Sequence, residues 1–218
     1  MINGQSAGKD LAYLYGVYMG DGSITKRSDK HFQFAFETID EDFMDKVIAT
    51  LFTFIKKTPT ILRRNRGKNR NDTFCISVSN IFFKDMYEST AGKKLIPEWI
   101  LNGDKHIKMA FLQGCLDSDG YVSVHHNKKG TKAFSMGYCK GTNYVHDIFT
   151  MMKNIGLTIG LPKAKEQKSN RICFYITINI KSWIKSGMKF SISRKNKRIQ
   201  EYIDKFCNPQ RLYVQQEK

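Results

Sequence analysis

The chain has 218 residues, 41% of them hydrophobic, but no apolar run approaches the length of a membrane-spanning helix, which excludes that class of protein. Its 36 lysine and arginine residues outnumber 20 aspartate and glutamate residues, and the formal net charge of +16 favours a polyanionic partner such as nucleic acid. The N-terminus has no apolar signal-peptide stretch, and the five cysteines are odd in number and widely spaced. We therefore expect an intracellular protein of the cytoplasm, nucleoid or organelle matrix that is not secreted.

The first hundred residues are predicted to alternate helices and strands in a fixed order. A helical pattern ending in Asp-Gly comes first, followed by two strands, a helix, two further strands and closing helical material. These predicted elements are residues 11–22, 23–27, 31–37, 40–52, 59–64 and 74–79. This half therefore reads αββαββα.

The same order of elements returns in the second half. Its predicted elements are residues 107–120, 121–126, 133–139, 143–155, 161–165 and 172–178. Equivalent positions lie about one hundred residues apart, and Asp119 follows Asp21 by 98 residues, which indicates a duplicated domain. We expect an α+β fold of two αββαββα units, residues 1–104 and 105–218, related by a pseudo-two-fold axis. Each unit would carry a saddle-shaped antiparallel sheet with its helices on one face.

Alternation along the strands divides each sheet into a core face and an open face. Phe32, Phe34 and Phe36 share one side of their strand and are expected to pack on the helices. The residues that alternate with such core positions, among them Gln33 and Tyr175, are left for the open face. In the second half the expected core residues are Ile172, Phe174, Ile176 and Ile178.

Basic hairpins and turns border the open faces. Residues 63–72 read RRNRGKNRND, the turn at 125–132 reads HHNKKGTK, and residues 163–171 carry three lysines and an arginine. Three such runs at matching places of a duplicated sheet predict a groove that follows DNA phosphates, with strand side chains available to base edges. The residues assigned to DNA contact are Ser23, Thr25, Arg27, Gln33, Glu37, Arg63, Arg64, Arg66, Lys68, Arg70, Ser77, Ser123, His125, Lys128, Lys163, Lys165, Arg171 and Tyr175.

The helix that opens each half is the strictest part of the repeat. Gly16 and Gly20 are four residues apart in the first helix, as are Gly114 and Ser118 in the second. Small residues at this spacing share one helical face, so the two helices can pack with their backbones nearly in contact.

Each of these helices ends in an aspartate, Asp21 or Asp119, followed by a glycine, Gly22 or Gly120, that we expect to be left-handed. The macrodipole disfavours negative charge at this end of a helix, and pairing the helices would bring two like charges together. Divalent metal ions are the natural compensation, because carboxylate oxygens suit Mg²⁺. Two carboxylates that share metal ions beside a phosphodiester form a two-metal hydrolytic site, so we predict an Mg²⁺-dependent endonuclease.

Residues 14–22, LYGVYMGDG, and 112–120, LQGCLDSDG, resemble the two motif helices of LAGLIDADG homing endonucleases. The resemblance extends over nearly the whole chain, because the repeated element order and the basic loops also match. It implies a monomer that binds a long asymmetric site in double-stranded DNA and cuts both strands, encoded by a mobile intron or intein. Mg²⁺ is the implied cofactor, Mn²⁺ is expected to substitute for it, and Ca²⁺ is expected to bind without supporting cleavage.

The resemblance also implies roles for single residues. Asp21 and Asp119 would be the catalytic metal ligands, joined by the backbone carbonyls of Gly20 and Ser118. Lys94 is the candidate for a catalytic basic residue that positions the attacking water.

The sixth motif position is acidic in many family members; it is Asp117 in the second helix but Met19 in the first. Because this position serves packing or capping more than catalysis, we expect Met19 to leave activity intact. Further candidates for a water-positioning role are Lys93, Lys189, Lys195, Glu37, Thr38 and Cys139.

Two other functions fit parts of the sequence. An intron RNA maturase can use the same fold, with its own intron RNA as partner, although the presence of both aspartates favours DNA cleavage. A non-catalytic DNA-binding regulator would typically add a helix-turn-helix, and after residue 190 the pattern indicates only a basic helical tail.

Overall fold

The computed structural model describes residues 5–67, 71–90, 95–126, 132–140, 144–166 and 172–207. The first half contains α1 (Gln5–Met19), β1 (Gly22–Ser28), β2 (His31–Thr38), α2 (Glu41–Ile55), β3 (Thr60–Arg64), β4 (Thr73–Ser79), α3 (Phe83–Ser89) and α4 (Glu98–Leu101). The second contains α5 (Lys105–Asp119), β5 (Gly120–His126), β6 (Lys132–Lys140), α6 (Val145–Asn154), β7 (Lys163–Glu166), β8 (Ile172–Thr177), α7 (Ile180–Ser186) and α8 (Ser193–Phe206). Within these ranges no helix is long and apolar enough to cross a membrane.

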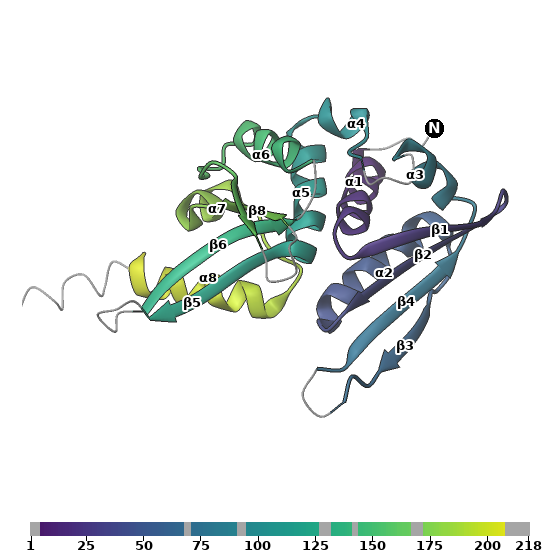
Figure 1. Cartoon of the computed structure of the whole chain (residues 1–218), viewed down its shortest axis with the longest axis horizontal. Coiled ribbons are helices and arrows are strands. Elements are labelled where there is room, and N and C mark those ends of the chain that lie inside the picture. Colours follow the sequence, from purple (N-terminus) through teal and green to yellow (C-terminus); the bar gives the residue numbers. More distant parts are fainter. Residues whose placement is uncertain are drawn as a thin grey trace, which may run out of the picture.

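Each half contains one four-stranded antiparallel sheet with helices on one face. The strand order is β1-β2-β4-β3 in the first half and β5-β6-β8-β7 in the second, so the two sheets have the same topology. In Figure 1, α1 and α5 lie side by side in the middle of the molecule, and the two sheets diverge from them. The predicted α+β fold of two αββαββα units is confirmed, and each unit ends in one more helix, α4 or α8.

The pairing register identifies equivalent positions in the two sheets. Phe36 of β2 pairs with Ile76 of β4, and Tyr138 of β6 pairs with Ile176 of β8. Two residues further along β2 and β6, Thr38 pairs with Phe74 and Lys140 with Phe174. Thr38 and Lys140 therefore occupy the same place in their respective halves.

The phenylalanines of β2 form the core as predicted. Phe32, Phe34 and Phe36 are at most 2% exposed, and Phe34 stacks on Phe83 of α3 with ring centroids 5.4 Å apart. These contacts fix the helical layer against the sheet and leave the opposite face of β2 open to solvent.

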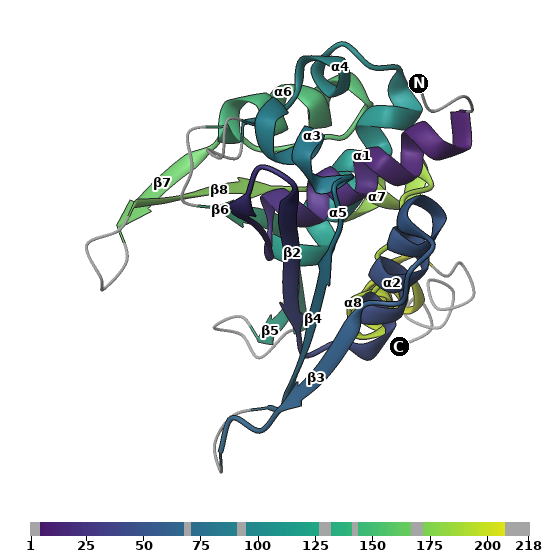
Figure 2. The same ribbon diagram turned by 90° about the vertical axis from the view of Figure 1, so that its right-hand side faces the viewer.

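In the second half, Ile176 and Ile178 are buried and Phe174 packs against the core, as expected. The expectation for Ile172 is wrong, because its side chain is 59% exposed. Ile172 pairs with Glu166 at the outer end of the β7–β8 hairpin, which extends past the helices in Figure 2. Alternation places Ile172 on the core face, but the core does not reach that far.

The seam between α1 and α5 has backbone packed on backbone. A Cβ atom at Gly16 would lie 2.1 Å from the Phe111 carbonyl oxygen, and one at Gly114 would lie 2.3 Å from that of Tyr13. At the next small pair, a Cβ atom at Gly20 would lie 2.2 Å from Cβ of Ser118. The predicted close approach of the two helices is confirmed.

The glycines that follow the two aspartates are required for a different reason from the one predicted. Neither Gly22 nor Gly120 has a positive φ; Gly120 is extended, with φ −76° and ψ 147°. Instead, a Cβ atom at Gly120 would lie 2.3 Å from the Leu116 carbonyl oxygen, and one at Gly22 would lie 2.8 Å from Cα of Tyr18. The strand leaves across the last turn of its own helix, and only glycine allows that close a path.

Candidate active site at the paired helix ends

The ends of α1 and α5 meet, and the predicted site residues come from both. Asp119 is the last residue of α5, and Asp21 lies two residues beyond Met19, the last residue of α1. A Cβ atom built on Gly20 would lie 3.1 Å from Oδ2 of Asp119. The structure thus brings Gly20, Ser118 and Asp119 together across the seam, with Asp21 immediately after Gly20.

Lys140 at the end of β6 contacts both helix ends, and it is not among the residues predicted from the sequence. Its Nζ donates to Oδ2 of Asp119 at 2.8 Å and to the carbonyl oxygen of Gly20 at 3.1 Å. The side chains of Lys140 and Asp119 are 21% and 17% exposed, so this ion pair is largely shielded from water. Cys139, named as a strand-end candidate, precedes Lys140 and pairs with Tyr175 of β8.

Asp21 is exposed and borders two hollows. One, of about 400 Å³, lies between the end of β2, the last turn of α5 and the start of α8, where Thr38, Ser118 and Arg194 line it. The other, of about 440 Å³, runs along the open face of the first sheet. Seven of the predicted DNA-contact residues line this second hollow together with Asp21: Ser23, Thr25, Arg27, Gln33, Glu37, Arg64 and Ser77.

The basic hairpin of the first half is held by a carboxylate. Glu37 accepts hydrogen bonds from the Thr73 hydroxyl and from Arg66, and it lies 3.5 Å from Arg64. The Thr73 hydrogen bond and the Arg66 guanidinium lower the pKa of Glu37. Arg63 instead pairs with Asp72 and, by strand alternation, lies on the face of β3 opposite Arg64.

On the second sheet, the predicted DNA-contact residues are more loosely arranged. Ser123 shares a 2.6 Å hydrogen bond with Ser135, His125 is exposed at the end of β5, and Lys163 pairs with Tyr175 across β7 and β8. Lys165 is exposed on β7. The candidates Lys68, Arg70, Lys93, Lys94, Lys128 and Arg171 lie outside the described residues.

Asp117 is buried at the wall of the hollow that Asp21, Thr38 and Ser118 also line. The side chain is 1% exposed and accepts hydrogen bonds from the Tyr13 hydroxyl at 3.1 Å and from the Ser191 backbone N–H at 2.8 Å. Burial raises the pKa of Asp117 to about 6, although these two donors favour the ionised form.

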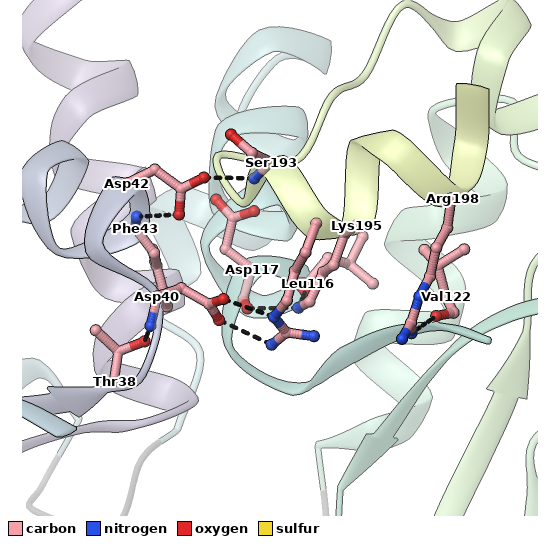
Figure 3. A network of polar contacts seen from close by, with 11 residues as sticks. Thr38, Asp40, Asp42, Phe43, Leu116, Asp117, Val122, Ser193, Lys195 and Arg198 are labelled. Carbon is pink, nitrogen blue, oxygen red and sulfur yellow. Dashed lines mark hydrogen bonds and ion pairs between the residues drawn. The ribbon is translucent and has the colours of Figure 1, made fainter. Parts of the chain in front are cut away.

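The side chain of Lys195, in α8, reaches the end of α5 near Asp117. Its Nζ donates to the carbonyl oxygens of Leu116 at 2.9 Å and Asp117 at 2.6 Å at the C-terminal end of α5, and the Leu116 oxygen also accepts the Gly120 backbone N–H. Lys195 is only 3% exposed, and burial lowers its pKa to about 8. Figure 3 shows this side chain reaching the end of α5 from the first turn of α8. Lys189, the other second-half candidate, lines a separate cavity with Lys9 and His106.

The oxygen atoms at the helix ends suit a cation. Gly20 contributes a carbonyl oxygen and Asp119 a carboxylate oxygen to one ammonium group, so these atoms already converge on positive charge. Hard divalent ions prefer this donor set. No group of three or more His, Cys, Asp or Glu side chains in metal-binding range occurs among the described residues.

Solved structures with the same architecture are endonucleases. Mesophilic variants of the homing endonuclease I-DmoI superpose with a TM-score of 0.56 at 13% identity, covering 84% of this chain and 94% of theirs. The homing endonuclease I-WcaI, bound to its DNA recognition sequence, gives 0.52 at 19% identity, covering 78% of this chain and 76% of its own. The chain has the homing endonuclease fold. I-DmoI has been solved in complex with DNA and Mn and with DNA and Ca.

Sequence relatives are distant, and no protein-family model matches the chain. An uncharacterised protein of Methanocaldococcus jannaschii is 26% identical over 214 residues, which cover 91% of this chain and 73% of that protein. The replication factor C small subunit of the same organism is 25% identical over 209 residues, or 93% of this chain and 11% of that protein. A ribonucleoside-diphosphate reductase alpha subunit of Bacillus subtilis is 28% identical over 137 residues, or 55% of this chain and 12% of that protein. The chain thus spans about a tenth of the replication factor C subunit and of the reductase subunit.

Proposed function

We propose that this chain is a site-specific double-strand DNA endonuclease that hydrolyses phosphodiesters with divalent metal ions. One observation carries the proposal: Asp119 and the Gly20 carbonyl, from two different helices, converge on one cation position beside Asp21, in a protein with the homing endonuclease fold. A net charge of +16 and the hollow along the first sheet, which leads to Asp21, support double-stranded DNA as the partner.

The chain's own residues would act in three ways. Asp21, Asp119 and the carbonyls of Gly20 and Ser118 would hold the metal ions, with Mg²⁺ as the expected cofactor, Mn²⁺ as a substitute and Ca²⁺ as a non-supporting ligand. Bound there, these ions supply Lewis-acid stabilisation to a phosphodiester. Strand residues of both sheets would contact base edges, and basic residues of the hairpins would contact phosphates.

The matched segments of replication factor C and ribonucleotide reductase support a mobile origin. Those proteins have different names and activities, yet each shares with this chain a segment of about a tenth of its length. A segment of that size fits an inserted module better than it fits the part that defines either activity. We therefore infer that this chain belongs to an intron- or intein-type mobile element and acts as a monomer of two units, residues 1–104 and 105–218.

The proposal is tested by incubating the full chain with DNA of its own gene's uninterrupted insertion locus. With Mg²⁺ or Mn²⁺ we expect one double-strand break at the insertion point, and with Ca²⁺ or EDTA no cleavage. A matched locus that already contains the insertion should stay intact, because the recognition site is interrupted. Intact DNA with tight binding would indicate a regulator, and intact DNA with binding and splicing of intron RNA would indicate a maturase.

A further inference from the structure

The paired helix ends already hold a positive charge of the protein's own. The Lys140 ammonium sits 2.8 Å from Oδ2 of Asp119 and 3.1 Å from the Gly20 carbonyl oxygen, distances typical of charge-assisted hydrogen bonds. Because both side chains are mostly shielded from water, the attraction between them is stronger than at an open surface.

The first half has no lysine at the equivalent place. By sheet register the counterpart of Lys140 is Thr38, whose hydroxyl accepts a hydrogen bond from the backbone N–H of Asp40, the residue before α2. Asp21 is exposed and borders the cavity that Thr38 lines. Two aspartates at equivalent motif positions therefore have different surroundings.

We propose that Lys140 is a resident cation of the second half-site and competes with divalent metal for Asp119 and the Gly20 carbonyl. The inference rests on the proposed function only in taking these oxygens as metal ligands. An ammonium and a divalent ion cannot occupy the same position between two oxygens, and they repel each other at that distance. A metal ion can therefore bind Asp119 and Gly20 only when Lys140 withdraws.

This competition has a consequence for the order of binding. In DNA-free protein, divalent metal should bind weakly at Asp119, because it must displace a paired ammonium. DNA phosphates give Lys140 a second anionic partner, so DNA binding should raise the metal affinity of this position. By linkage, metal should raise DNA affinity by the same factor.

The test is a calorimetric Ca²⁺ titration of the DNA-free full chain. Lys140→Met should gain at least about tenfold in Ca²⁺ affinity over wild type, since it loses a charge-assisted competitor. Lys140→Gln keeps a hydrogen-bond donor without the charge and should also gain Ca²⁺ affinity. A gain in both variants cannot be caused by a folding defect of the Met variant alone. Lys181→Met, an exposed position on α7, removes the same charge from the same half and should leave Ca²⁺ affinity unchanged. Adding Asp119→Asn to Lys140→Met should abolish the gain.

Equal Ca²⁺ affinity in wild type, Lys140→Met and Lys140→Gln would overturn the inference. So would a gain that survives Asp119→Asn, because the new site would then not be the one Lys140 occupies. The proposed function fails by a different result, the absence of cleavage at the insertion locus. That result leaves the Ca²⁺ titrations and their interpretation intact.

Discussion

The ends of α1 and α5 carry equivalent motif residues but differ in their chemistry. At the end of α1, the Met19 carbonyl accepts a hydrogen bond from the Tyr144 hydroxyl of the second half at 3.0 Å. At the end of α5, the carbonyls of Leu116 and Asp117 accept from the Lys195 ammonium. Each of these carbonyl groups thus receives a buried donor from elsewhere, a neutral hydroxyl at Met19 and a charged ammonium at Leu116 and Asp117. In both halves, carbonyl oxygens at the helix end accept hydrogen bonds, but the residue type that donates them differs between the halves.

The largest expected effect comes from removing either motif carboxylate. Asp21→Asn and Asp119→Asn should each lower double-strand cleavage at least about 100-fold, since the metal sites supply several kcal/mol of transition-state stabilisation. DNA affinity without metal should be kept or improved, because a negative charge near the phosphates is gone. Strand-specific end-labelling of the cleaved DNA is the measurement.

The same assay compares the two halves directly. Nicking of one strand by only one of the two variants would mean that the two half-sites work independently. Normal cutting of both strands in either variant would contradict the assignment of the aspartates.

The basic hairpin of the first half should account for part of the salt dependence of DNA binding. The double substitution Arg64→Ala/Arg66→Ala should reduce the log–log slope of affinity against salt by up to about 1.8, at roughly 0.9 for each phosphate contact. Arg63→Ala is the matched control, because Arg63 pairs with Asp72 on the opposite face of β3. A slope that falls as much in the control would assign the DNA to that other face. Lys163→Ala/Lys165→Ala provides the second-half comparison.

The seam between the halves should tolerate almost no added volume. Gly16→Ala places a methyl group 2.1 Å from the Phe111 carbonyl oxygen and should lower the free energy of unfolding by about 3 kcal/mol. Gly8→Ala, earlier in α1, meets only the flexible end of Ile107 at 3.3 Å and should be neutral or stabilising by up to about 1 kcal/mol. Urea denaturation of both variants measures the difference, and equal stabilities would contradict close packing at the seam.

These comparisons also show what the sequence could and could not predict. Because the repeat shows the same pattern in both halves, each helix and strand could be predicted from two separate segments. The order of helices and strands and the small-residue seam were therefore predicted correctly. Lys140 was missed because a lysine at a strand end looks like a surface residue. Only the pairing of β6 in the sheet brings it to Asp119, 21 residues away. Local pattern cannot reveal a partner that depends on tertiary register.

The predicted basic helical tail forms α8, but its contacts were not predicted, for a similar reason. The segment SRKNKRIQEYIDKF is predominantly polar, yet its Lys195 is almost fully buried against the end of α5. Predicting this requires knowing that α8 packs with Lys195 against the carbonyl oxygens of the last turn of α5. The prediction that the glycines after the aspartates are left-handed was wrong, because glycine is needed there for the strand's close path past its own helix and not for a left-handed turn.

Lys195 should make stability depend on pH in the alkaline range. The folded-state pKa is about 8, against roughly 10.4 for an unfolded lysine, so between these values the unfolded chain binds more protons. Stability should therefore rise with pH across this window, by roughly 3 kcal/mol relative to Lys195→Met, in which the group is absent. Urea denaturation of both proteins from pH 7 to 10 tests this, and a constant difference between them would mean that burial does not depress this pKa.

The smallest expected effect concerns how α8 is tied to the first half. Arg194 donates from Nε to Oδ1 of Asp40 at 2.5 Å and from Nη2 to Oδ2 at 2.8 Å, and the Ser193 N–H donates to Asp42. These contacts cross from the second half to the start of α2 and are independent of the α1–α5 seam. The Arg194 side chain is 48% exposed, so the pair should contribute only about 1 kcal/mol, despite its two parallel hydrogen bonds.

A double-mutant cycle with Arg194→Gln and Asp40→Asn measures that coupling directly. We expect it to shrink in 1 M NaCl, where the Debye length is about 3 Å, because the pair is partly open to ions. A coupling that persists at high salt would mean that α8 is clamped to the first half more tightly than its exposure indicates. A coupling of zero at low salt would leave the α1–α5 seam as the main determinant of the angle between the two sheets, and hence of the shape offered to DNA.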